Sequence, residues 1–125
     1  MIWLAIALGG AFGAMGRYGL TTYLLPVDAK SFPWGTLTAN VIGSALIGLC
    51  YVLIVEKSLL NVAWKPLVMT GFLGAFTTYS TFALESFLLW QQGSTAIAVA
   101  YAISSLLGCL CAVSASVWLA TKLIH

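Results

Sequence analysis

Long apolar stretches separated by short polar segments dominate the sequence. A helix needs about 20 apolar residues to cross the hydrocarbon core of a bilayer. Four stretches of about that length or longer lie between the charged and polar breaks, at about 2–25, 33–55, 64–90 and 95–123. The pattern predicts an all-α membrane protein in which residues 1–125 form a single domain of four transmembrane helices.

The third stretch contains a segment that fits poorly into a continuous helix. Gly71 and Gly74 precede five hydroxyl residues at 77–81. Glycine costs a helix about 1 kcal/mol, and Ser and Thr offer the backbone competing hydrogen bonds. We expect a break here, although the hydroxyls would only bend the helix if they bonded back to carbonyls one turn earlier. Unpaired backbone in a membrane is tolerated where it is buried in protein or lines a wet cavity, and its carbonyls suit a hard cation such as Na⁺.

Polar residues form a stripe on each of two other helices. Residues four apart share a helical face, and the stripes comprise Thr36, Asn40 and Ser44 in the second stretch and Tyr101, Ser105 and Cys109 in the fourth, with Ser104 beside them. A lone membrane Asn more often joins helices than binds a ligand. Aligned with hydroxyl groups, Asn40 would instead supply hydrogen-bond donors to an anion.

Composition agrees with a lipid environment, because 62% of the 125 residues are hydrophobic and 6% are charged. Soluble domains carry roughly a quarter of their residues as charged side chains. The net charge of +2 comes from scattered residues, which excludes a nucleic-acid surface. Arg17 and Glu85 are the charges expected within or at the edge of the membrane. Each serves either as a structural anchor or as a charge at a pore mouth.

The remaining charges give the topology only a weak bias. With four spans, Lys57, Lys65 and Lys122 share one side of the membrane, against Lys30 and Arg17 on the other. So small a difference orients a protein poorly. It therefore permits insertion in both orientations and antiparallel pairing of two copies.

Small residues recur at intervals of four, at Gly9 and Gly13 and at Ala39 and Gly43. Such spacing lets helix backbones approach closely. The contact is either within one protomer or between two copies, and the sequence favours neither.

Enzyme chemistry has no support in the sequence. The cysteines, Cys50, Cys109 and Cys111, lie in apolar runs and are expected to pack between helices, and the single histidine is His125. The sequence contains no phosphate-binding loop, nucleophile elbow or paired carboxylates. The protein is therefore not expected to be an enzyme.

Three motifs resemble those of the Fluc/CrcB fluoride channels. They are Gly-Gly-x-x-Gly-x-x-x-Arg at 9–17, Gly-Thr-Leu-Thr-Ala-Asn at 35–40, and Gly-x-x-Gly-Ala-Phe-Thr-Thr-Tyr-Ser-Thr-Phe at 71–82, which is followed by Glu85. Length and span count agree as well, so the resemblance covers essentially the whole chain. It implies an antiparallel, dual-topology homodimer in the cell inner membrane, with two pores that export fluoride passively and lower its cytoplasmic concentration.

The resemblance also assigns roles to residues. It implies a structural Na⁺ at the dimer centre, held by the main-chain carbonyls of Gly74 and Thr77 of each subunit. Asn40 would donate to fluoride, with hydroxyls replacing its water and two aromatic rings lining the pore; these residues are Ser80, Thr81, Tyr101 and Ser105, and Tyr79 and Phe82. Two positions depart from the family pattern, since Tyr79 stands where Phe is usual and Cys109 where Ser is common.

Two other functions fit a small four-helix membrane protein. A proton-coupled exporter of the small multidrug type depends on a carboxylate in its first helix, whereas the first stretch here contains Arg17 and no acid. A membrane scaffold without transport would use the hydroxyl clusters only for packing, but the short loops leave it little surface for partners.

Overall fold

The computed structural model describes residues 1–26, 28 and 30–125, and the described residues contain helices and no strands. The helices follow the predicted stretches, with π-helical segments at several ends. Their bounds are α1 Ile2–Gly19, η1 Leu20–Leu24, α2 Trp34–Cys50, η2 Tyr51–Glu56, η3 Val62–Trp64, η4 Pro66–Leu73, α3 Gly74–Phe76, α4 Ser80–Gln91 and α5 Thr95–Leu123.

Three continuous or nearly continuous helices are long and apolar enough to cross a membrane. They are Trp34–Glu56, Val62–Gln91 and Thr95–Leu123. The protein is therefore a multi-pass membrane protein. The first helix, α1 with η1, covers the predicted first span but falls outside this set, because glycines and Arg17 lower its hydropathy. A fourth span therefore stays a prediction.

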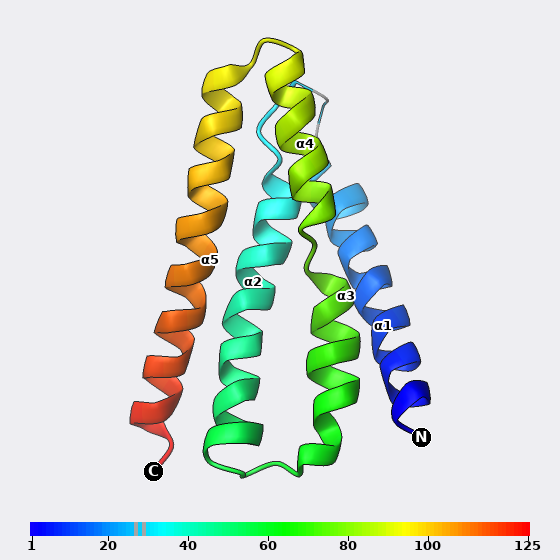
Figure 1. The fold of residues 1–125 in the computed structure, drawn as a ribbon, viewed down its shortest axis with the longest axis vertical. Coiled ribbons are helices and arrows are strands. Elements are labelled where there is room, and N and C mark those ends of the chain that lie inside the picture. The colour runs from blue at the N-terminus through cyan, green and yellow to red at the C-terminus, as the bar shows by residue number, and fades with distance from the viewer. Residues whose placement is uncertain (27, 29) are drawn as a thin grey trace.

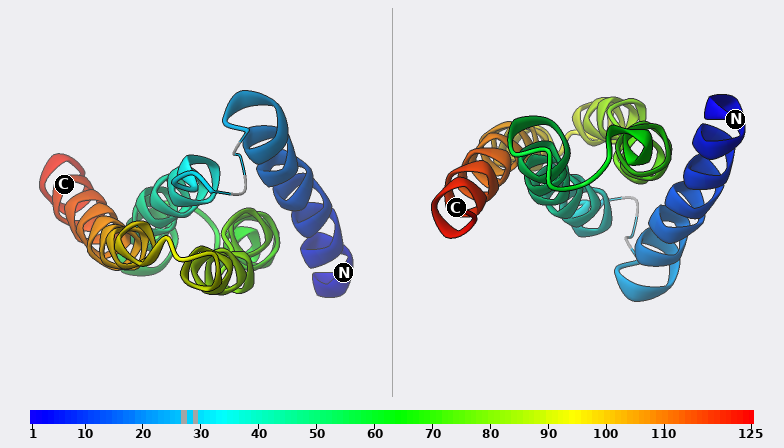
Figure 2. Two further views of the ribbon diagram at one scale, coloured as in Figure 1. Left: turned by 90° about the horizontal axis from the view of Figure 1, so that it is seen from above. Right: turned by 90° about the horizontal axis from the view of Figure 1, so that it is seen from below.

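The helices form a flattened bundle rather than a round one. Helix α2 packs against α5, and α1 packs against η4 and α3. Figures 1 and 2 show α1 and α5 on opposite sides of the bundle, with α2 and the third span between them. Both chain termini lie at one end, which we call the terminal end (Figure 1).

Glycines bring α1 into backbone contact with the first half of the third span. A Cβ atom added to Gly9 or Gly13 would collide with backbone atoms of Leu67 or Phe72, respectively. Gly43 of α2 is similarly close to the side chain of Thr77. Of the two alternatives for the small-residue pairs, the structure therefore shows contact within one protomer.

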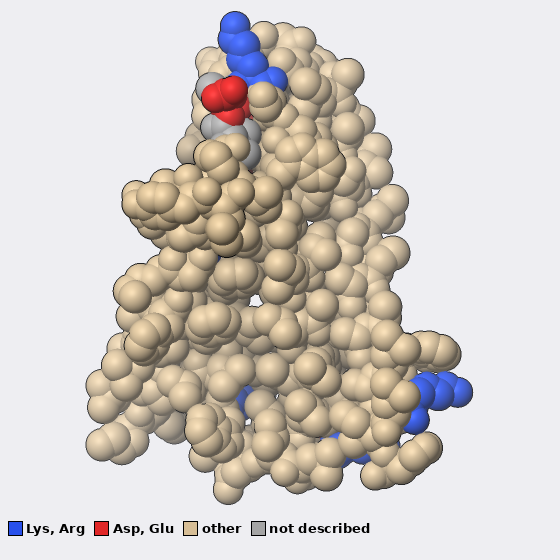
Figure 3. Space-filling view, turned by 180° about the vertical axis from the view of Figure 1, so that it is seen from behind, with Lys and Arg blue, Asp and Glu red and all other residues tan. Residues whose placement is uncertain are grey.

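The surface matches a protein surrounded by lipid. Figure 3 shows the charged side chains of this face mainly toward the two ends of the molecule, with an uncharged region between them. Many large apolar side chains are exposed along the helices, among them Leu106 and Leu107 near the middle of α5. Apolar side chains exposed at mid-helix need lipid or another protein as their solvent.

Candidate ion pathway beside the broken third helix

The third span is broken, as the glycine and hydroxyl cluster predicts. Helix α3 ends at Phe76, Thr77 has an extended backbone (φ −84°, ψ 157°), and α4 begins at Ser80. The Thr77 hydroxyl also donates to the Leu73 carbonyl one turn earlier, at 2.9 Å. One hydroxyl of the cluster therefore bonds back to the helix, and the helix still breaks.

Asn40 pairs with the backbone exposed by the break. Its Nδ2 donates to the Thr78 carbonyl at 2.9 Å, and the Thr78 amide donates to Asn40 Oδ1 at 2.7 Å. One side chain of α2 thus satisfies both peptide groups of a residue that has left the helix. An Asn amide group carries two N–H donors, so a second donor remains for another partner.

At the break, two backbone amides bond to side chains instead of to the carbonyls that would accept from them in a regular helix. In an α-helix the amide of residue i bonds to the carbonyl of residue i−4, which pairs Thr78 with Gly74 and Thr81 with Thr77. Here the Thr78 amide bonds to Asn40, and the Thr81 amide bonds to Thr78 Oγ1 at 3.2 Å. The carbonyls of Gly74 and Thr77 are the pair that the family resemblance assigns to Na⁺. Neutral carbonyl oxygens suit such a hard cation.

Arg17 contacts the same break from the other side. Its Nε donates to the Ala75 carbonyl at 3.1 Å, and the side chain is partly buried. A cation at the C-terminal end of a helical segment compensates its free carbonyls and its dipole. Of the two roles predicted for Arg17, this contact supports the structural anchor.

Glu85 joins three helices near the opposite end of the bundle. Its Oε1 accepts a hydrogen bond from Thr36 Oγ1 of α2 at 2.6 Å and a longer one from the Tyr101 hydroxyl of α5 at 3.4 Å. Sequence spacing grouped Thr36 with Asn40, but the two side chains serve different partners. The pairing of Thr36 with Glu85 has no signal in the sequence, because 49 positions separate them.

Aromatic rings meet edge to face above the break. The Phe82 and Tyr101 ring centroids are 5.1 Å apart with planes at 62°, and Tyr79 lies 5.6 Å from Phe82. Tyr101 is fully buried, whereas Tyr79 is 81% exposed. In one protomer Phe82 therefore packs against both rings, whereas Tyr79 is mostly exposed.

A groove of about 700 Å³ runs along the break between α2 and α5. It brings together several predicted pathway residues, namely Asn40, Tyr79, Phe82 and Ser105, with the Na⁺-site residue Thr77 and the stripe residues Ser44 and Cys109. Sequence reasoning did not place Gly43 and Thr78 in this lining. The sequence signal for Gly43 was its spacing of four from Ala39, which indicated a close helix contact, and Gly43 indeed lies against the Thr77 side chain.

Three predicted pathway residues do not line the groove. Thr81 receives a hydrogen bond from Thr78 Oγ1 at 3.1 Å, and Ser80 lies 3.4 Å from the same atom. The Tyr101 hydroxyl donates to Glu85. In the protomer these groups hold the break and the helix joint, and their contact with an ion stays a prediction.

Ser105 is the groove residue with an unused polar atom. It is 7% exposed, and its Oγ is buried with no hydrogen-bond partner among the described residues. A buried hydroxyl without a partner costs about 1–3 kcal/mol. Ser105 lines the same groove as Asn40, and a hydroxyl without a partner there suits a ligand that accepts hydrogen bonds.

Comparison with known proteins places the chain in a family. Residues 4–117 match the sequence model of a family described as CrcB-like protein, Camphor Resistance (CrcB). The chain belongs to the CrcB-like family. The match includes the broken third helix and all of the groove-lining residues.

Relatives of this CrcB-like chain extend over nearly its full length. A protein of Saccharophagus degradans is 48% identical over 124 residues, which cover 99% of this chain and 92% of the relative. Proteins of Magnetococcus marinus and Hahella chejuensis are 46% and 45% identical, covering 86% and 95% of this chain and 87% and 93% of theirs. Each is named fluoride-specific ion channel FluC.

Proposed function

We propose that this chain is a fluoride-specific ion channel of the inner membrane, which lowers cytoplasmic fluoride by passive export. Membership of the CrcB-like family and relatives named as fluoride channels support the proposal. The observation that carries it in this chain is the groove beside the break. There Asn40, which keeps a second N–H donor, and Ser105, whose hydroxyl has no partner among the described residues, line one space with Phe82.

These groups suit fluoride because the ion is small and strongly hydrated. Its water must be replaced by hydrogen-bond donors as it leaves solution, and the amide of Asn40 and the hydroxyl of Ser105 are such donors. The edge of an aromatic ring is positive and attracts an anion weakly. Donors and ring edges of Phe82 bind without a fixed cation, so the ion can leave again, as conduction requires.

A second copy of the chain completes the pathway in this proposal. Tyr79, Ser80 and Gly74 are exposed around the break, in the part of the helix that lies within the membrane. Polar groups and irregular backbone are not tolerated against lipid. We infer an antiparallel homodimer of dual topology in which the two breaks meet, and lipid surrounds the remaining apolar surface.

The dimer centre would hold Na⁺ through the carbonyls of Gly74 and Thr77 of each subunit. Support comes from the diverted amides of Thr78 and Thr81, which leave those carbonyls without their regular helical donors. No group of three or more His, Cys, Asp or Glu that could bind a metal occurs among the described residues. A carbonyl site for a cation is consistent with that composition.

The alternative of a proton-coupled exporter is not favoured by any observation. The first helix contains Arg17 and no carboxylate, and Glu85 is held by Thr36 and Tyr101 in a joint between helices. The relatives named above are channels, which are not enzymes. The experiment below therefore tests the channel function.

The test is fluoride efflux from liposomes that contain the purified protein, measured with a fluoride electrode. We expect fast efflux of fluoride and none of chloride. Phe82→Ile should slow fluoride efflux by at least tenfold, because an aliphatic side chain has no positive edge to face the ion. Phe87→Ile, which changes an exposed aromatic residue of the same helix outside the groove, is the matched control and should keep the wild-type rate. Wild-type liposomes that release no more fluoride than empty ones would refute the channel.

A further inference from the structure

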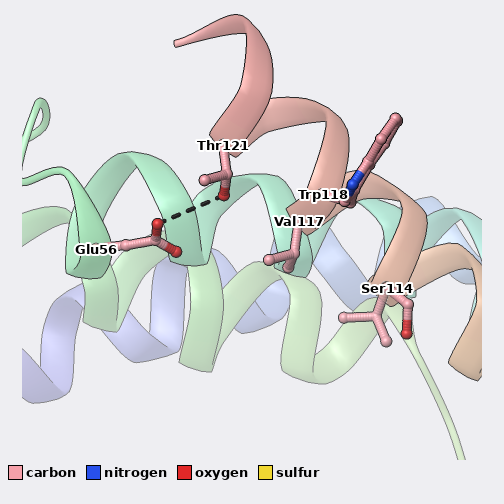
Figure 4. Close-up of a pocket in the computed structure, with 6 residues that line it drawn as sticks. Glu56, Ser114, Val117, Trp118 and Thr121 are labelled. Carbon is pink, nitrogen blue, oxygen red and sulfur yellow. Dashed lines mark hydrogen bonds between the residues drawn. The ribbon is translucent and has the colours of Figure 1, made fainter. Parts of the chain in front are cut away.

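A second hollow lies between the ends of α2–η2 and α5 at the terminal end of the molecule. Its volume is about 560 Å³, and its lining comprises Glu56, Val113, Ser114, Val117, Trp118 and Thr121 (Figure 4). Val113 also lines the groove that contains Asn40 and Ser105. The two hollows therefore share Val113 as a lining residue.

One face of α5 lines both hollows. Its residues recur at intervals of four, and each lines one hollow or the other: Ser105, Cys109, Val113, Val117 and Thr121. At 1.5 Å per residue, the distance along α5 from Ser105 to Thr121 is roughly 24 Å. A path along this face would lead from the break to the terminal end, with the second hollow as its entrance.

This entrance has one carboxylate in its lining and two lysines close to it in the chain. Glu56 Oε1 accepts a hydrogen bond from Thr121 Oγ1 at 3.4 Å, which keeps the carboxylate over the hollow (Figure 4). Lys122 lies beside it, with Nζ 5.7 Å from the centre of the Trp118 ring. Lys57 follows Glu56 directly and is exposed. Of the described residues that line the entrance, only Glu56 is charged.

We propose that Glu56 limits the rate of fluoride entry by lowering the anion concentration at this entrance. The proposal rests on the proposed function, because it concerns the same pathway. A fixed charge changes the local concentration of mobile ions and thereby the rate at which they arrive, without touching them at their binding site. A carboxylate at the mouth of an anion pathway slows entry, and the neighbouring Lys122 partly offsets it.

The experiment compares fluoride efflux of single variants at two ionic strengths, set with potassium isethionate. At 0.01 M the Debye length is about 30 Å, and at 1 M it is about 3 Å. Glu56→Gln should raise the efflux rate about twofold at the low ionic strength, as expected for one charge about 10 Å away in water. The increase should vanish at 1 M. Lys122→Gln should lower the rate by a similar factor at 0.01 M.

Glu56→Asp is the matched control, because it keeps the charge and shortens the side chain, and it should keep the wild-type rate at both ionic strengths. An unchanged rate for Glu56→Gln at 0.01 M would overturn the proposal, as would a Glu56→Asp rate equal to that of Glu56→Gln. The absence of efflux in the wild type would instead refute the channel itself. Failure of the proposal and failure of the proposed function are therefore distinguishable.

Discussion

The third and fourth spans both carry hydroxyl residues in their apolar runs, yet only the third is broken. Helix α5 is continuous from Thr95 to Leu123 although it contains Ser104 and Ser105 at mid-length. Ser116 of α5 donates back to the Val113 carbonyl at 3.1 Å, and the helix continues. In the third span the bond from Thr77 to Leu73 has the same form and is followed by extended backbone.

The difference lies in the neighbours of the two spans. The Asn40 side chain hydrogen-bonds to both the amide and the carbonyl of Thr78, and Arg17 donates to the carbonyl of Ala75. Helix α5 has no side chain on an adjacent helix that pairs with its backbone among the described hydrogen bonds. Hydroxyl residues thus weaken a membrane helix, and a partner for the freed peptide groups decides whether it breaks.

Removing that partner gives the largest expected effect. Asn40→Ala leaves the Thr78 amide and carbonyl without partners inside the membrane, at a cost of about 3 kcal/mol. It also removes the donor proposed for fluoride. We expect fluoride efflux to fall at least a hundredfold and the melting temperature of the protein in detergent to drop by several degrees, measured on the same preparation.

The matched control is Ser44→Ala, one turn further along the same face of α2 and also in the groove lining. It has no hydrogen bond to the break, so its melting temperature should stay at the wild-type value. An Asn40→Ala protein as stable as the wild type would show that the break does not depend on this amide.

The next largest loss of stability is expected when the close contact between α1 and the third span is disturbed. Gly13→Ala places a methyl group against the Phe72 backbone, which cannot move aside as a side chain can. Forcing atoms into such a contact costs about 1–3 kcal/mol. Gly19→Ala is the control, because nothing lies within 4 Å of its added methyl group. Denaturant titration in detergent micelles should separate the two, and equal stability of both variants would contradict the backbone contact.

Ser105→Ala should have the smallest effect on stability. Its buried hydroxyl has no partner among the described residues, so its removal breaks no hydrogen bond and should raise the free energy of unfolding by about 1 kcal/mol. Fluoride efflux should nevertheless slow several-fold, since one donor of the pathway is lost. Ser116→Ala, outside the groove, should keep the wild-type efflux rate. A Ser105→Ala protein with unchanged efflux would exclude this hydroxyl from the pathway.

Sequence reasoning predicted the features that depend on local patterns. The break at 77–79 followed from glycine and hydroxyl residues close together, and the polar face of α5 followed from the interval of four between Ser105 and Cys109. Such patterns are visible because the residues that cause them are neighbours in the chain or on one helix.

Features that join distant residues could not be predicted in this way. The partners of Asn40 and Glu85 lie 38 and 49 positions away, and the Ala75 carbonyl lies 58 positions from Arg17. For the glycines of α1 the spacing indicated close packing without showing the partner. Tyr79 and Ser80 illustrate the same limit, because they are exposed in the protomer and the cover proposed for them is a second chain.

The pairing of Asn40 with both peptide groups of Thr78 limits where the chain can gain or lose a residue. A helix insertion of one residue between position 40 and the end of η2 would turn everything after it by about 100° and shift it by 1.5 Å. A residue added between Pro66 and Phe76 would displace Thr78 in the same way. The loop at 57–61, with Ser58 at φ 51°, lies outside every hydrogen bond of the break. Insertions and deletions compatible with transport are therefore expected there, while the helical lengths on either side stay constant.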